Sequence, residues 1–244
     1  RKEGRETENG LPAPFGFRRV ERRKTMKTRV KICCIKSREE AELALRYGAS
    51  ALGFVSAMPS GPGPISDDHI AAIIMFVPPG IATFLLTCQR EAAAIISQLQ
   101  KTKANTLQLV DAVPLTVYPE LRAALPGITV VQVIHVTGAD AVEAAKAVAP
   151  FVDAILLDSG NPNLPVKELG GTGRVHDWKL SRTIHEHVTV PVYLAGGLRP
   201  DNVAEAIRLV RPYAVDLCSG VRSNGELDEA KLSAFFSRVS AAHS

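Results

Sequence analysis

Several short apolar runs in this 244-residue chain end in a side chain that can move a proton or accept a hydrogen bond. Cys33 and Asp158 end two such runs, Gln108 lies near the end of a third, and Asp216 lies in the last. A thiol and a carboxyl group can act as general base and general acid, and an amide or second carboxylate can hold a substrate hydroxyl or amine. Taken alone, a cysteine such as Cys33 is more often a small buried hydrophobe, and Asp158 could equally be a cap or turn former. Their shared position favours proton-transfer chemistry.

Glycines form a second pattern. Gly170-Gly171-Thr172-Gly173 follow the run that ends near Asp158, Gly196-Gly197 follow the next run, and Ser219-Gly220 follow the last. One glycine pair is weak evidence, because many tight turns need a positive φ angle. Together, however, these segments would expose backbone N–H groups at the start of helices, where phosphate binds. The expected phosphate ligands are Gly171, Gly173, Gly196, Gly197, Ser219 and Gly220.

The elements that must position these groups repeat along the chain. Eight β-branched or Leu-rich runs alternate with Ala-rich segments of helical periodicity. The runs are 29–35, 51–56, 81–87, 106–111, 129–136, 154–159, 190–197 and 214–220. Their starts lie 22 to 36 residues apart, which is enough for a strand, a loop and a crossover helix.

The intervening segments carry helix start signals. Ser37 with Glu40 fits a capping box that opens a helix closing at Gly48, and Ser66 precedes two acidic residues and an apolar run. Pro200 suits the first position of a helix, and Asp228 precedes a final amphipathic helix. Every apolar strand is therefore expected to be followed by a helix.

Strands that are apolar on both faces and alternate with helices belong to covered parallel sheets. Eight repeats predict a single (β/α)8 TIM barrel over residues 26–244. The alternative is a doubly wound open sheet, but no glycine-rich dinucleotide fingerprint follows the first run, which continues into Cys33-Cys34-Ile35-Lys36. In a (β/α)8 barrel the active site is built at the carboxyl ends of the strands, where the acid, base and glycine segments would meet.

The net charge of +4 is concentrated at one end of the chain. Residues 1–25 hold eight basic and four acidic side chains, and the remaining residues are balanced. This stretch lacks periodicity and is expected to be a flexible basic extension, disordered or non-native, lying outside the barrel. A nucleic-acid-binding arm is the less favoured alternative, because few aromatic residues interrupt the basic ones. No nucleic-acid or membrane partner is therefore expected.

Cysteine usage and hydropathy indicate the compartment. The chain has four cysteines, and the adjacent Cys33-Cys34 pair has neither zinc-ligand spacing nor the geometry for an easy mutual disulfide. No apolar run approaches the ~20 residues of a membrane span, and the basic N-terminal stretch lacks the apolar core of a signal peptide. A cytoplasmic protein with reduced thiols is expected.

Together, these segments resemble the phosphoribosylanthranilate isomerase family of tryptophan biosynthesis, whose members are barrels of the ribulose-phosphate-binding type. The resemblance covers the chain from Met26 onward, and the matching segments occur in the family's order. They are Lys31-Ile32-Cys33 with Ile35, Gly53-Phe54-Val55, Leu107-Gln108-Leu109, Leu156-Leu157-Asp158-Ser159, Gly170-Gly171-Thr172-Gly173, Asp177-Trp178, Ala195-Gly196-Gly197-Leu198 and Val215-Asp216 with Ser219-Gly220-Val221. The whole set makes the resemblance specific.

The resemblance implies an Amadori rearrangement of N-(5-phosphoribosyl)anthranilate, without a cofactor or metal. It implies that Asp158 is the general acid that opens the ribose ring and Cys33 the general base that removes the C2′ proton. Asp216, Gln108 and Arg222 would bind the substrate. The small phosphorylated substrate is the expected partner, and the sequence does not indicate an oligomeric state.

This chain departs from the family pattern, as a divergent member would. Cys34 replaces a glycine, and strand alternation would let only one of the two thiols face the site, expected to be Cys33. Val110-Asp111 replaces the usual His-Gly, and Arg222 stands where a Glu is usual. The family's arginine after the second strand, near the anthranilate, is missing from Ser60-Gly61-Pro62-Gly63-Pro64. Either Arg222 or Arg174 supplies that charge, or the substrate lacks the carboxylate.

Two alternatives to the anthranilate reaction stay open at this point. The barrel could serve as an isomerase or lyase for another phosphorylated sugar or aminosugar, since one phosphate site and one acid–base pair suit several substrates. It could also be a binding protein that has lost turnover. The histidines show no spacing that indicates a metal site, and His185 and His187 would not share a helix face.

Overall fold

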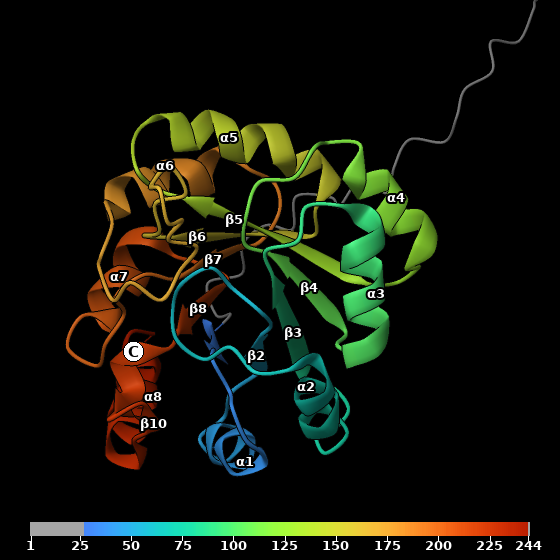
Figure 1. Ribbon diagram of the computed structural model, residues 1–244. Helices are drawn as coiled ribbons and strands as arrows, with labels where there is room; N and C mark the ends of the chain where they lie inside the picture. Colours follow the sequence, from blue (N-terminus) through green and yellow to red (C-terminus); the bar gives the residue numbers. More distant parts are fainter. Residues whose placement is uncertain (1–26, 244) are drawn as a thin grey trace, which may run out of the picture.

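The computed structural model describes residues 27–243 and shows eight parallel strands that close into a barrel inside a layer of helices (Figure 1). Neighbours in the sequence are neighbours in the barrel, and β8 pairs with β1. The strands are β1 (Arg29–Ile32), β2 (Ala51–Val55), β3 (Ala82–Thr87), β4 (Thr106–Leu109), β5 (Thr129–His135), β6 (Ala154–Asp158), β7 (Val192–Leu194) and β8 (Ala214–Leu217). This order confirms the predicted (β/α)8 barrel over the open sheet.

One α-helix follows each strand. The helices are α1 (Arg38–Arg46), α2 (Asp67–Ile74), α3 (Ala92–Thr102), α4 (Val117–Ala124), α5 (Asp140–Val148), α6 (Trp178–His187), α7 (Val203–Val210) and α8 (Glu229–Ala241). Two short 3-10 helices add to them, η1 (Ala149–Phe151) and η2 (Ser219–Val221), and a small hairpin joins β9 (Arg222–Ser223) to β10 (Glu226–Leu227) before α8.

The alternating side chains of each strand belong to two separate apolar cores. On β6, Ile155 and Leu157 join the large cluster between strands and helices, whereas Ala154 and Leu156 join the cluster inside the barrel. Because successive side chains point to opposite faces, Asp158 continues the inner row. The strand thereby carries its terminal carboxyl group toward the barrel axis.

The predicted helix starts are mostly confirmed. The Ser37 hydroxyl accepts a hydrogen bond from the Glu40 N–H, Ser66 does the same for His69, and Asp228 caps α8 at Lys231. The Glu40 carboxylate reaches back to the Lys36 N–H, one residue beyond the usual capping-box partner. The caps therefore fix where α1, α2 and α8 begin.

The prediction that Pro200 occupies a first helical position is wrong. Helix α7 begins at Val203, and Pro200 lies in the preceding turn. The Asn202 side chain holds this turn by accepting from the Arg199 N–H at 2.8 Å and donating to the Gly197 carbonyl at 3.0 Å. These side-chain bonds satisfy the backbone groups of the turn and delay the helix by one turn.

The predicted N-terminal extension over residues 1–25 lies outside the described residues and stays a prediction. The described part starts beside the other end of the chain, since the Thr28 N–H donates to His243 Nε2 at 2.9 Å. Within residues 27–243, no helix has both the length and the apolar character needed to cross a membrane.

Candidate active site

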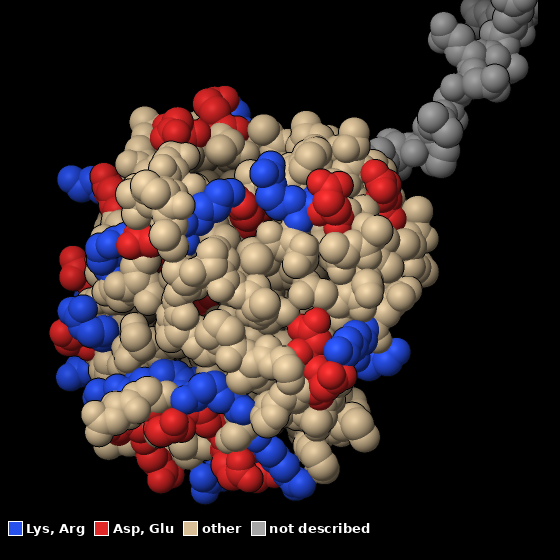
Figure 2. Space-filling view, in the orientation of Figure 1, with Lys and Arg blue, Asp and Glu red and all other residues tan. Residues whose placement is uncertain are grey.

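A hollow of about 710 Å³, counting its open mouth, lies at the carboxyl end of the barrel. In Figure 1 the β2–α2 loop crosses in front of the strands at this end, and Figure 2 shows the same face with a mostly uncharged centre and charged side chains around it. Of the residues predicted for the site, all but Arg222 line the pocket. They are Cys33, Gln108, Asp158, Gly171, Gly173, Gly196, Gly197, Asp216, Ser219 and Gly220.

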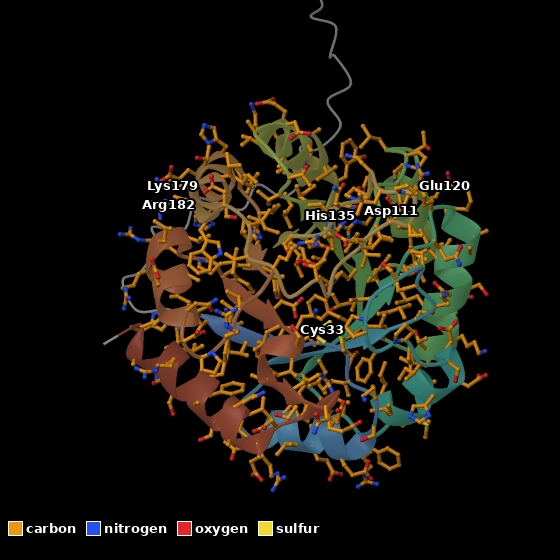
Figure 3. All side chains as sticks on the ribbon, turned by 60° about the vertical axis from the view of Figure 1, so that its left-hand side comes forward. Cys33, Asp111, Glu120, His135, Lys179 and Arg182 are labelled. Atoms are coloured by element: carbon orange, nitrogen blue, oxygen red, sulfur yellow. The ribbon has the colours of Figure 1, made fainter. Side chains whose placement is uncertain are left out.

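Cys33 lies near the middle of the molecule (Figure 3) and shares the barrel interior with Lys31, two residues earlier on β1. A Cβ atom on Gly53 of β2 would lie 2.7 Å from Cys33 Sγ and 3.1 Å from Lys31 Nζ. Only glycine leaves room at this point for both side chains. The Cys33 side chain therefore points inward, on the same side as Lys31.

Lys31 is fully buried and forms an ion pair with Asp216 of β8, with 2.8 Å between Nζ and Oδ2. Burial alone would lower the pKa of Lys31, but the charge and hydrogen bond of Asp216, together with nearby Cys33 and Cys34, outweigh it and raise that pKa above its usual value. The ammonium group also lies 4.9 Å from the centre of the Phe84 ring. The sequence patterns did not predict this buried cation below the pocket. The indication present in the sequence was a lysine two residues before Cys33 in an otherwise apolar run.

Cys34 also lines the pocket, which corrects the expectation that only one of the two thiols would face it. Strand β1 ends at Ile32, and Cys34 has a φ angle of 63°, so alternation no longer applies. The neighbouring side chains of Cys218 and Cys33, together with burial, raise the pKa of Cys34. Cys34 packs against Gly63 of the β2–α2 loop, where a Cβ would lie 2.6 Å from Cys34 Cβ. The two thiols thus occupy different parts of the pocket wall.

Asp158 ends β6 and is buried beside Ser159, whose N–H donates to its Oδ1 at 2.7 Å. Burial raises the pKa of Asp158, and the Ser159 N–H and nearby His135 of β5 only partly oppose this effect. A Cβ on Gly170 would lie 2.8 Å from the other carboxylate oxygen, so the β6–α6 loop closes over it. A carboxyl group in this setting keeps its proton to a higher pH than an exposed aspartate does.

Two buried oxygen atoms at the pocket have no hydrogen-bond partner among the described residues. They are Gln108 Oε1 on β4 and Asp216 Oδ1 on β8. Because a buried acceptor without a donor is costly, such atoms indicate where a ligand's N–H or O–H groups would bind. The two acceptors come from distant strands, so they can contact different parts of one ligand.

The predicted glycine segments meet at the β6–α6, β7–α7 and β8–η2 connections. Gly196 and Gly197 have φ angles of 81° and 62°, and Gly171 and Gly173 have 67° and 68°. Gly220 is constrained by space instead, since a Cβ there would lie 1.9 Å from the Leu198 carbonyl oxygen. The backbone can therefore approach a ligand closely on this side of the pocket.

Arg222 does not line the pocket, so the structure does not bring it together with the other predicted substrate ligands. Its guanidinium forms a buried ion pair with Glu40 at 2.5 Å and donates to the carbonyl oxygens of Cys34 and Gly225. Burial acts to raise the pKa of Glu40, but the hydrogen bond and charge of Arg222, together with the backbone N–H groups of Lys36 and Leu227, lower it below its usual value. Arg222 thus fastens the end of β1 to α1 and the β9–β10 hairpin. Because Glu40 pairs with its buried charge, an arginine is tolerated at position 222.

Arg174 pairs with Glu168 within the β6–α6 loop and has a half-exposed side chain. It also does not line the pocket, and no Lys or Arg side chain does so among the described residues. The β2–α2 loop, where the family's arginine is missing, instead packs Pro62 against Gly171 and bonds Ser60 Oγ to the Lys167 carbonyl at 2.6 Å. These contacts bring the two loops together over the pocket.

The histidines do not form a metal site in the structure. Within residues 27–243, no group of three or more His, Cys, Asp or Glu side chains could hold a metal ion. His176 is buried, and burial lowers its pKa to about 4 while its Nε2 lies 2.7 Å from Ser181 Oγ. His185 and His187 lie in the last turn of α6, away from the pocket lining.

A closed eight-stranded parallel barrel that opens at its carboxyl end onto a buried acid and a thiol is a (β/α)8-barrel enzyme. Residues 30–238 match the model of the family described as N-(5'phosphoribosyl)anthranilate (PRA) isomerase. The chain belongs to this family, the one that the sequence motifs resemble.

Named relatives agree with the family match. The N-(5'-phosphoribosyl)anthranilate isomerase of Methanosarcina acetivorans is 37% identical over 227 residues, covering 88% of this chain and 94% of that protein. Isomerase 2 of Methanosarcina mazei is 39% identical over 213 residues, covering 86% and 93%. This chain therefore spans nearly the full length of these relatives.

Solved structures give the same result. Phosphoribosyl anthranilate isomerase from Thermotoga maritima has a TM-score of 0.76 and 30% identity, covering 88% of this chain and 99% of that one. A phosphoribosyl anthranilate isomerase in complex with reduced 1-(o-carboxyphenylamino)-1-deoxyribulose 5-phosphate has a TM-score of 0.73 and 28% identity, with the same coverage.

Proposed function

We propose that this chain is an isomerase that converts N-(5-phosphoribosyl)anthranilate into 1-(2-carboxyphenylamino)-1-deoxyribulose 5-phosphate by an Amadori rearrangement. The main support is that Cys33 and Asp158 line one pocket in a chain that belongs to this isomerase family. A thiol and a carboxyl group can carry out the proton transfers without a cofactor or metal.

Asp158 is the proposed general acid. Its raised pKa favours the protonated form, which can donate to the ribose ring oxygen. The bond between that oxygen and C1′ then breaks, and the nitrogen lone pair forms an iminium ion. Burial in the pocket makes the charged form of Asp158 costly. Because the carboxyl group then keeps its proton to a higher pH, Asp158 is a better acid catalyst near neutral pH.

Cys33 is the proposed general base. Its thiolate removes the proton from C2′, and the electron pair of the C–H bond moves toward the iminium carbon to give an enolamine. Tautomerisation of the enolamine adds a proton at C1′ and leaves the ketone at C2′. The base must stay unoxidised, so we include a reducing, cytoplasmic setting in the proposal.

Asp216 and Gln108 are the proposed ligands of the substrate's amine and hydroxyl groups, because each carries a buried acceptor without a donor. The ion pair with the buried Lys31 ammonium holds the Asp216 side chain in place. The glycine segments and Ser219 would bind the phosphate through backbone N–H groups. Phosphate binding energy then serves to orient C2′ toward Cys33.

A second candidate is an isomerase or lyase for a phosphorylated sugar that lacks the anthranilate carboxylate. The observation that favours it is the absence of a Lys or Arg side chain from the described pocket lining. Substrates with and without the carboxylate distinguish the two candidates.

The function is tested by mixing the purified full chain with freshly prepared phosphoribosylanthranilate and following the loss of anthranilate fluorescence. We expect loss well above the rate without protein and a return to background with Asp158→Asn. A wild-type rate equal to background would overturn the proposal for this substrate.

A further inference from the structure

We infer that Lys167 provides the positive charge that meets the carboxylate on the substrate's aromatic ring. This inference rests on the proposed function, and it names a residue that determines substrate specificity. It differs from the two positions considered from the sequence, Arg222 and Arg174. An apolar wall of the pocket, the contacts of Lys167 and the fixed roles of the other cations support this assignment.

The pocket wall away from the connections after β7 and β8 is apolar. Val55 of β2, Met58 of the β2–α2 loop, Leu86 of β3, Val110 after β4 and Leu169 of the β6–α6 loop line it. If the phosphate binds at the connections after β7 and β8, the other end of the substrate lies against this wall. Such a surface suits an aromatic ring, which gains from burial against aliphatic side chains.

Lys167 lies at the edge of this wall. Its ammonium contacts the Asp111 carboxylate at 2.5 Å, and Asp111 directly follows Val110 of the wall. Its carbonyl oxygen accepts the hydrogen bond from Ser60, which lines the pocket, and Leu169 is two residues further along. The backbone of Lys167 is thereby held at the junction of the two loops that cover the pocket.

The Lys167 side chain has the freedom that this role requires. Its side chain is 39% exposed, whereas that of Asp111 is only 9% exposed. Asp111 is also fixed by the Ala112 N–H, which donates to Oδ1 at 2.9 Å. Asp111 therefore keeps the ammonium at the rim, and the flexible lysine stem can turn it toward a second carboxylate while retaining the first.

The other cations near the pocket are already used. Arg222 is buried against Glu40, and Lys31 is buried below the pocket against Asp216. Arg174 forms two bonds with Glu168, and its side chain is more exposed than that of Lys167. Among these four cations, Lys167 is the one that combines contact with a pocket-lining residue, a partly exposed side chain and a position beside the apolar wall.

The test measures binding by calorimetry of two non-reacting ligands to the full chain. The first is reduced 1-(o-carboxyphenylamino)-1-deoxyribulose 5-phosphate, and the second is the same compound without the ring carboxylate. Lys167→Met should weaken binding of the first about ten- to a hundredfold and leave the second unchanged, as expected for one lost charged hydrogen bond. Lys167→Arg should retain most of the affinity.

Arg174→Met is the matched control, because it removes another ion-paired cation from the same loop. It should leave both affinities unchanged. Equal affinity of wild type and Lys167→Met for the carboxylated ligand would overturn the role of Lys167, and so would an equal loss for both ligands, which indicates a structural effect. If the wild type binds neither ligand, the proposed function itself fails, so the two failures are distinguishable.

Discussion

The two ends of the pocket are built from different parts of the chain. At the connections after β6 and β7, glycines with positive φ angles form the surface, and after β8 the tightly packed Gly220 joins them. At the opposite end, after β2, β3 and β4, side chains form most of it. Backbone ligands require particular φ angles and close approach, so few substitutions are compatible with them. Side-chain ligands can move to another loop, which allows this end to lose the family's arginine.

The reacting groups lie between these ends, and their loss should have the largest effect. Cys33→Ser or Asp158→Asn should lower kcat by about 10²- to 10⁴-fold, because each removes one proton-transfer group. Cys34→Ser is the control for a thiol in the same pocket and should retain most of the activity. Steady-state rates with phosphoribosylanthranilate check this prediction. A larger loss of kcat for Cys34→Ser than for Cys33→Ser would assign the general-base role to Cys34.

Asp158→Asn should also change the pH dependence of stability. Because burial raises the folded-state pKa of Asp158, its contribution to stability is fully present below the unfolded pKa and is lost as pH rises through the folded value. Because the asparagine side chain at position 158 cannot ionise, the variant avoids that loss of stability. Relative to wild type, it should become more stable as pH rises from 4 to 8 in thermal unfolding. A constant difference across that range would contradict the buried-acid assignment.

Arg222→Met tests whether Arg222 belongs to the frame and not to substrate binding. It leaves the buried Glu40 carboxylate without its partner, so unfolding free energy should fall by about 3–5 kcal/mol. The lowered pKa of Glu40 means that its part of the stability is present above the unfolded pKa and is lost as pH falls through the folded pKa. Urea unfolding at pH 7 and pH 3 should show a smaller deficit at pH 3.

The Arg222 prediction has a separate readout for binding. Under conditions where Arg222→Met is folded, its affinity for the reduced product analogue should differ little from wild type. A large loss of affinity with unchanged stability would instead show that Arg222 binds the substrate.

At the backbone-lined end, Gly196→Ala should weaken phosphate binding about ten- to a hundredfold. The new Cβ would lie 2.9 Å from His176 Nδ1 and 3.1 Å from Ser159 Oγ, and the φ angle of 81° disfavours alanine. Gly127→Ala is a matched control, because Gly127 has a φ angle of 84° and nothing within 4 Å of the added Cβ. Both variants should lose about 1–2 kcal/mol of stability from backbone strain. Only Gly196→Ala should lose affinity in titrations with inorganic phosphate.

The smallest effect is expected for Cys34→Gly. Glycine relieves the left-handed strain at a φ angle of 63°, but it loses more backbone entropy on folding and removes the contact with Gly63. These opposing effects should leave unfolding free energy within about 1 kcal/mol of wild type. Urea unfolding with an activity assay checks this, and loss of turnover with intact folding would show that the Cys34 thiol takes part in the reaction.

The sequence predicted the barrel because period and spacing are local properties of the chain. The alternation on β6, for example, is enough to direct Asp158 to the barrel interior. The missed features are contacts between distant residues. Glu40 and Arg222 are 182 residues apart, and Lys31 and Asp216 are 185 residues apart, so spacing could not reveal either pair. Cys34 was misjudged because β1 ends one residue before Cys33, and alternation holds only within a strand.

The most direct test of the proposed isomerisation is proton NMR of phosphoribosylanthranilate incubated with the purified chain. Rearrangement predicts that the anomeric proton signal disappears and that a methylene signal beside nitrogen appears at the same rate, both abolished in Asp158→Asn. Release of free anthranilate and ribose 5-phosphate at the rate seen without protein, with no methylene signal, would contradict the proposal.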